Sequence, residues 1–95
     1  TDEFTEVFET AVRMFPDDTI ANLNAANAAM RRGDLTSAKR YLAKADDSPE
    51  AVYARGALAI RQKDYDSARR YLNEAKSLGL EQAGITLEQL EKGRR

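Results

Sequence analysis

The sequence contains the segment GDLTSAKRYLAKA at residues 33–45 and a near copy of it, KDYDSARRYLNEA, at residues 63–75. Asp, Ser-Ala, Arg, Tyr-Leu and a final Ala recur at matching positions of the two segments. A repeat at this spacing is typical of chains built from one supersecondary unit used several times. The two segments therefore predict a helical repeat architecture.

Each copy has the pattern of an amphipathic helix. The apolar residues of the first copy fall on one face at helical spacing: Leu35, Ala38, Tyr41, Leu42 and Ala45. Asp34 precedes this stripe as an N-cap, and Gly33 suits the end of an earlier helix. We therefore expect helices over about residues 35–46 and 65–77.

A further helix precedes each copy. Residues 18–32 follow Pro16, with Asp17 or Asp18 as the N-cap, and residues 49–62 follow the start signal Ser48-Pro49. The inner faces of these helices carry small residues, namely Ala26, Ala29, Gly56 and Ala59. Small side chains let two antiparallel helices approach closely, so each copy is expected to form a hairpin with the helix before it.

The two ends of the chain add one helix each. Residues 3–14 have a Phe-rich side and form half a unit, and residues 81–92 form a capping helix. We predict a single domain over residues 1–95, with the first repeat at 18–46 and the second at 49–77. An unpaired Phe-rich side would make homodimerisation through the N-terminal helix plausible. The half unit also predicts that more protein precedes Thr1.

The composition excludes several classes of function. The 95 residues include no Cys, His or Trp, so Cys–His and Ser–His nucleophiles are absent and a zinc site is improbable. We expect no enzyme activity, no catalytic residue, no metal and no cofactor. Residues 31–76 hold eleven bases and seven acids, a weak basis for nucleic-acid binding. No run of about 20 apolar residues exists, so we expect no direct membrane insertion of this segment.

These motifs resemble the tetratricopeptide-repeat (TPR) family. The family's turn and second helix are matched by Gly33-Asp34-Leu35, Ala38, Leu42 and Ala45, and again by Asp64-Tyr65, Ala68, Leu72 and Ala75. Phe8, Ala11 and Pro16 match the second helix of a preceding unit. The resemblance covers about residues 3–92 and implies a TPR-like α-α superhelix of about six helices.

The chain departs from the family pattern in three places. The step from Ala45 to Ala75 is thirty residues instead of the family's thirty-four, so the connection at residues 46–48 is short. Asn22 and Val52 stand where the family has a Trp-like residue. Arg55 stands where an apolar residue is usual. These departures put regular superhelix geometry in doubt at the joint between the units.

The resemblance implies that a peptide or protein partner binds on the concave surface lined by the first helices. The residues expected there are Leu23, Asn24, Asn27, Met30, Arg31, Tyr53, Ile60 and Arg61. Asn27 with Arg31 and Arg61 could bind a peptide backbone and its carboxylate. Alternatively, the asparagines belong to a solvated face and the arginines complement helix C-termini.

Two classes of function follow from this interpretation. The chain is either an interaction and scaffolding module with a peptide groove, or a structural spacer or assembly tail without one. The segments FETAVRMFPDD (residues 8–18) and ANLNAAN (residues 21–27) are similar to TPR tails of bacterial cell-envelope proteins of the outer-membrane or fimbria-associated kind. That likeness implies a place in the cell envelope as part of a longer protein, and it favours the structural class.

Overall fold

The computed structural model describes residues 3–93, and these residues form six α-helices and no β-strand. The helices are α1 (Glu3–Met14), α2 (Thr19–Arg32), α3 (Leu35–Lys44), α4 (Pro49–Arg61), α5 (Tyr65–Ser77) and α6 (Glu81–Gly93). The all-α fold and the expected series of helices are confirmed.

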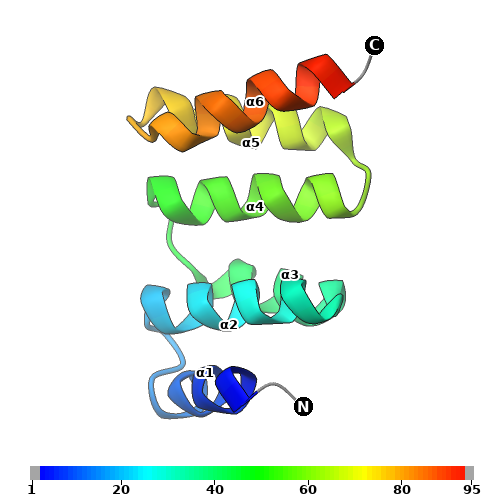
Figure 1. Ribbon diagram of the computed structural model, residues 1–95. Helices are drawn as coiled ribbons and strands as arrows, with labels where there is room; N and C mark the ends of the chain where they lie inside the picture. Colours follow the sequence, from blue (N-terminus) through cyan, green and yellow to red (C-terminus); the bar gives the residue numbers. More distant parts are fainter. Residues whose placement is uncertain (1–2, 94–95) are drawn as a thin grey trace. The chain divides into compact units, whose positions relative to one another are not determined.

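The helices group into two compact units. Unit 1 holds α1, α2 and α3, unit 2 holds α4, α5 and α6, and the division falls between Asp46 and Asp47. In unit 1, α2 contacts both α1 and α3, and in unit 2, α5 contacts both α4 and α6. The chain reverses direction from α4 to α5 and again from α5 to α6 (Figure 1). The assignment of residues 1–95 to one domain stays a prediction.

The hairpins α2–α3 and α4–α5 turn in the same way. Gly33 follows α2 with a φ of 80°, and Lys63 occupies the matching place after α4 with a φ of 62°. The next residue in each turn, Asp34 or Asp64, donates its backbone N–H to a carbonyl of the helix just ended, at 2.8 and 2.9 Å. This is a Schellman-type helix end, which favours glycine because the left-handed conformation is strained for other residues.

Small side chains build the core of unit 1. Four alanines of α2 have 0–1% of their surface exposed: Ala25, Ala26, Ala28 and Ala29. Ala38 and Leu42 of α3 are buried to the same degree, at 0% and 2%. With no long side chain on this side of α2, the helices of the α2–α3 hairpin can approach closely, as the sequence predicts.

The buried polar residue Asn22 fixes the connection between α1 and α2. Its side chain is fully buried, and its Nδ2 donates to the carbonyl oxygens of Pro16 at 3.0 Å and Asp18 at 2.9 Å. The Asp18 carboxylate in turn accepts from the Ala21 N–H at 3.1 Å and caps α2. Where a Trp-like residue is usual, this chain therefore uses an amide that satisfies loop carbonyls.

The core of unit 2 joins all three of its helices. Val52 of α4, Leu72 and Ala75 of α5, and Ala83 of α6 are buried together. Gly56 lies where α4 meets α5, and a Cβ atom at this position would stand 3.0 Å from Leu72 Cδ2. The sequence-based expectation that Gly56 lies on the inner face of the hairpin is therefore correct.

The connection between α3 and α4 is longer than the predicted helices imply, because α3 ends earlier. The prediction of a helix to residue 46 is wrong, because α3 stops at Lys44 and Ala45 is extended, with ψ at 156°. Residues 45–48 form the connection, and Pro49 begins α4. Asp46 donates its N–H to Thr19 Oγ1 at 3.1 Å, and Asp47 accepts from Arg55 Nη1 at 3.0 Å. Arg55 therefore binds this connection instead of filling an apolar position.

Candidate functional site

The exposed side of α2 forms one narrow stripe. Seven residues of this helix are buried: Ala21, Asn22, Ala25, Ala26, Ala28, Ala29 and Met30. Apart from Arg32 at the C-terminal end, the exposed residues of α2 are Ile20, Asn24, Asn27 and Arg31, which are spaced by four, three and four positions. At 100° per residue these four side chains point within about 60° of one another. We call this set the α2 stripe.

Three of the residues predicted for the site therefore share one accessible face. Asn24, Asn27 and Arg31 belong to the α2 stripe, and Leu23 lies half-buried at its edge. Met30 is only 7% exposed, so its side chain belongs to the core and not to the accessible face. Ile20, which is 67% exposed, was not among the residues predicted for the site. Its position four residues before Asn24 was the available signal.

The chemistry of the α2 stripe suits an extended peptide. Each asparagine carries two N–H donors and one carbonyl acceptor, which match the donors and acceptors of a peptide backbone. Arg31 has no ion pair with any described side chain, so its guanidinium can pair with a carboxylate by two parallel hydrogen bonds. Ile20, at the opposite end of the stripe, offers an apolar contact.

The predicted residues of α4 have a different environment. The Tyr53 hydroxyl forms a hydrogen bond with Thr86 Oγ1 of α6 at 2.9 Å. Tyr53 and Ile60 are both partly buried and pack against the core of unit 2, whereas Arg61 is exposed. The contact of α6 with this side of α4 was not predicted from the sequence. A binding role for these three residues stays a prediction.

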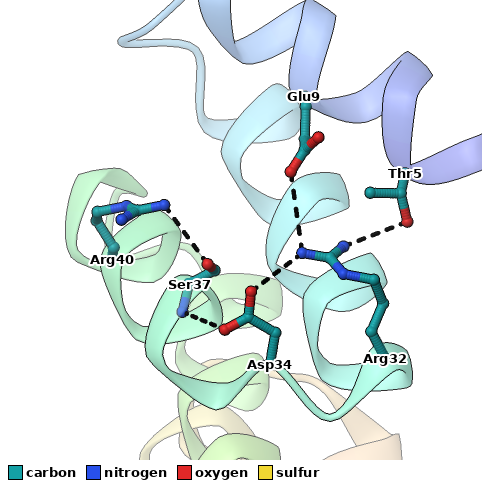
Figure 2. A network of polar contacts seen from close by, with 6 residues as sticks. All are labelled: Thr5, Glu9, Arg32, Asp34, Ser37 and Arg40. Atoms are coloured by element: carbon teal, nitrogen blue, oxygen red, sulfur yellow. Dashed lines mark hydrogen bonds and ion pairs between the residues drawn. The ribbon is translucent and has the colours of Figure 1, made fainter. Parts of the chain in front are cut away.

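A polar network at the C-terminal end of α2 holds α1 in place (Figure 2). Arg32, the last residue of α2, donates to the hydroxyl of Thr5 at 3.2 Å and to the carboxylate of Asp34 at 3.3 Å. Glu9 lies 3.9 Å from the same guanidinium. Thr5 is only 6% exposed, so this is the buried side of α1. We interpret the network as structural because its polar atoms satisfy one another.

Asp34 and Asp64 are the N-caps of α3 and α5. Their carboxylates accept the backbone N–H of Ser37 at 3.1 Å and of Ser67 at 3.3 Å. Hydrogen bonds from the hydroxyl and N–H of Ser37, assisted by Arg32, hold the pKa of Asp34 below its ordinary value of 3.8. The hydroxyl and N–H of Ser67 lower the pKa of Asp64 in the same way. Both carboxylates are therefore helix caps and show no sign of acid–base tuning for catalysis.

The described residues contain neither a cluster of metal ligands nor a membrane-spanning helix. Between residues 3 and 93, no three His, Cys, Asp or Glu side chains gather closely enough to hold a metal ion. Within the same range, no helix combines the length and the apolar character needed to cross a bilayer.

Comparison with known proteins bears on the repeat. A family profile described as "Tetratricopeptide repeat" matches residues 6–41 and again residues 37–83. The two matches together cover most of the chain, from α1 to the start of α6. A search of curated proteins gave no match.

Proposed function

Because the chain belongs to the tetratricopeptide-repeat family, whose repeats are generally protein–protein interaction modules, we propose that it binds an extended peptide or partner segment along the α2 stripe. One observation carries the proposal. Residues 19–32 of α2 are buried on nearly every side, yet two carboxamides, one guanidinium and one isoleucine line up on the remaining side.

The order of residues along the stripe defines the ligand. Asn24 and Asn27 would bind the backbone of the peptide, because a carboxamide can donate to a carbonyl and accept from an N–H. Arg31 would bind an acidic side chain or the terminal carboxylate. Ile20 would contact an apolar side chain about three turns of α2 away from that carboxylate. The expected ligand is thus a short segment with an acidic end and an apolar residue.

Selection from a random peptide library displayed on phage, followed by affinity measurement with synthetic peptides, tests this proposal. Asn24→Ala combined with Asn27→Ala should weaken the selected peptides by about tenfold or more, because about 1 kcal/mol is lost with each hydrogen bond. The matched control is Asn73→Ala, at an exposed position of α5. Selected peptides that bind the double variant as tightly as the parent protein would rule out the α2 stripe.

A second candidate is a structural or assembly role within a larger bacterial cell-envelope protein. Its support is the resemblance of residues 8–18 and 21–27 to TPR tails of such proteins, together with exposed apolar residues in the terminal helices. In this case deletion of residues 1–95 from the parent protein should disturb its assembly or surface display, whereas substitutions in the α2 stripe should have no effect. A parent protein that assembles normally without these residues would exclude this role.

A further inference from the structure

The outer side of α3 carries cations and no acid. Opposite the buried residues Ala38 and Leu42, this helix presents five exposed residues, namely Thr36, Lys39, Arg40, Ala43 and Lys44. At 100° per residue these five positions fall within about 140° of one another. We call this set the α3 face. Three of its residues are cations and none is an acid, so its formal charge is +3.

The matching side of α5 is neutral. The residues thirty positions further along the chain are Asp66, Arg69, Arg70, Asn73 and Glu74, so two acids offset two cations. Asp66 forms an ion pair with Arg69. Glu74 follows Arg70 at the i, i+4 spacing at which opposite charges attract. The two repeats therefore expose the same positions, but only the second supplies its own counter-charges.

The cations of the α3 face have no counter-charge among the described residues. No ion pair joins any of them to a described acid. Nη2 of Arg40 lies 3.5 Å from the Ser37 hydroxyl oxygen (Figure 2), and its guanidinium lies 5.7 Å from the centroid of the Tyr41 ring. Both of these partners are neutral. Arg40 and Lys44 also repel each other, because they are like charges at the i, i+4 spacing.

The acids at the two ends of α3 leave this charge in place. Asp34 caps the helix and binds Arg32 of α2. Asp46 lies beyond the end of α3, after the backbone has become extended. Lys44 stands in the last turn, where a cation complements the helix dipole. The two cations in the middle of the helix have no such reason for their position.

We propose that the α3 face docks an acidic segment of a partner protein, which supplies the carboxylates that this helix lacks. Charge complementarity selects this occupant. Lys39 and Lys44 are five residues apart, so the cations span about 7.5 Å along the helix axis, which suits a short segment with several acids. Thr36 and Ala43 have short side chains that leave room for its backbone. The contact goes beyond the α2 stripe and does not depend on it.

The charge of the rest of unit 1 favours a short acidic segment over a long polyanion. Residues 1–46 hold eight acids and six bases, which gives this unit a formal charge of −2 despite the +3 of the α3 face. A nucleic acid or an anionic bilayer would extend beyond the α3 face and be repelled by these acids. Three cations also neutralise only about three phosphates, which gives weak binding. A short segment contacts the cations alone.

Nuclear magnetic resonance of the ¹⁵N-labelled 95-residue chain tests the proposal. The probe is a synthetic peptide of alternating Glu and Ala, and its control has Gln in place of every Glu. At low salt the acidic peptide should shift the amide signals of residues 35–45, and the Gln peptide should shift none of them. At about 1 M salt, where the Debye length falls to about 3 Å, the shifts should disappear.

Two triple variants locate the interaction. The test variant removes the three cations of the α3 face by Lys39→Gln, Arg40→Gln and Lys44→Gln. The control variant removes three exposed cations of unit 2 by Lys63→Gln, Arg70→Gln and Lys76→Gln. The test variant should bind the acidic peptide about tenfold to a hundredfold more weakly, because each exposed charge pair contributes about two- to fivefold. The control variant, which has the same net charge, should bind within about twofold of the parent chain, and circular dichroism should show equal helicity for both.

Four results would overturn the proposal. Equal weakening in the two triple variants would show an effect of net charge alone. Shifts confined to Asn24, Asn27 and Arg31 would place the acidic peptide on the α2 stripe and leave the α3 face without a partner. Tighter binding of oligothymidylate or of phosphatidylglycerol vesicles through the same cations would assign the face to polyanions. Shifts of residues 35–45 that grow with protein concentration in the absence of peptide would identify a second copy as the occupant.

The two surfaces can be tested separately. Asn24→Ala with Asn27→Ala should leave binding of the acidic peptide to the α3 face unchanged, although it weakens peptides selected for the α2 stripe. Failure of one proposal is therefore distinguishable from failure of the other.

Discussion

Replacing Gly56 by alanine should destabilise the protein although it places a better helix former in α4. An alanine Cβ would stand 3.0 Å from Leu72 Cδ2, 3.1 Å from Leu72 Cγ and 3.3 Å from Tyr71 Cβ. Ordinary van der Waals contact between carbon atoms begins at about 3.5 Å. Leu72 has no exposed surface, so it cannot move aside without displacing its own neighbours.

The magnitude follows from two opposing terms. A Gly→Ala change inside a helix normally stabilises by about 0.5–1 kcal/mol. Forcing an extra methyl group into a packed core costs about 1–3 kcal/mol. The expected net loss at Gly56 is therefore about 0.5–2 kcal/mol, and Gly56→Leu should cost more because it adds three further carbon atoms. This loss is a substantial fraction of the 5–15 kcal/mol that stabilises a typical small protein.

Gly84→Ala is the matched control. Its Cβ would meet only the Lys76 side chain, at an ordinary distance of 3.5 Å. This variant should gain the helix-propensity term, about 0.5–1 kcal/mol, without the packing cost. The two alanine variants should therefore differ by about 1–3 kcal/mol.

Thermal and urea unfolding followed by circular dichroism measure this difference. For a chain of this length, 1 kcal/mol corresponds to about 4–8 °C in Tm. Gly56→Ala should melt below the parent protein and Gly84→Ala above it. If both substitutions raise Tm equally, α4 does not approach α5 at Gly56, and the packing described for unit 2 is incorrect.

Three further changes test other parts of the structure. Lys63→Gly should stabilise the protein by about 1 kcal/mol in urea unfolding, because glycine adopts the left-handed conformation without strain. Gly33→Ala should destabilise the protein by a similar amount. Equal stability of the two variants would contradict this account of the turns. Asp34 and Asp64 have lowered pKa values, so their contribution to the stability of the folded protein is complete above pH 4 and declines as pH falls through the lowered values. Replacing both by Asn should therefore flatten the dependence of Tm on acid pH. An unchanged profile would argue against the two caps. Arg32→Met should increase amide hydrogen exchange in α1 more than in α3, whereas equal exchange would exclude the anchoring role.

Local signals were sufficient to predict the helices. Asp18, Gly33, Asp34 and the Ser48-Pro49 pair all cap helices where their residue types predict, because capping depends on neighbours within four residues. The early end of α3 could not be predicted in the same way. Ala45 continues the apolar spacing of α3, so periodicity alone extends the helix past the residue at which the backbone becomes extended.

The candidate site was predicted only in part, for a related reason. Asn24, Asn27 and Arg31 share a face of α2 by helical spacing alone, so the sequence was enough to group them. The position of Tyr53 against Thr86 depends on how α6 returns over α4, thirty-three residues later in the chain. The Arg32 network likewise joins α2 to Thr5 of α1. Contacts of this range leave no periodic signal in the sequence.

The alanine-lined interior of α2 has a consequence for mutagenesis. Alanine scanning measures the cost of removing side-chain atoms, but at Ala25, Ala26, Ala28 and Ala29 no atom beyond Cβ exists to be removed. Such a scan would report this part of the core as silent although it is almost completely shielded from water. Enlargement is the informative change here, because each added methyl group must displace a neighbour. For the same reason, this helix can tolerate very little inherited variation on its inner side.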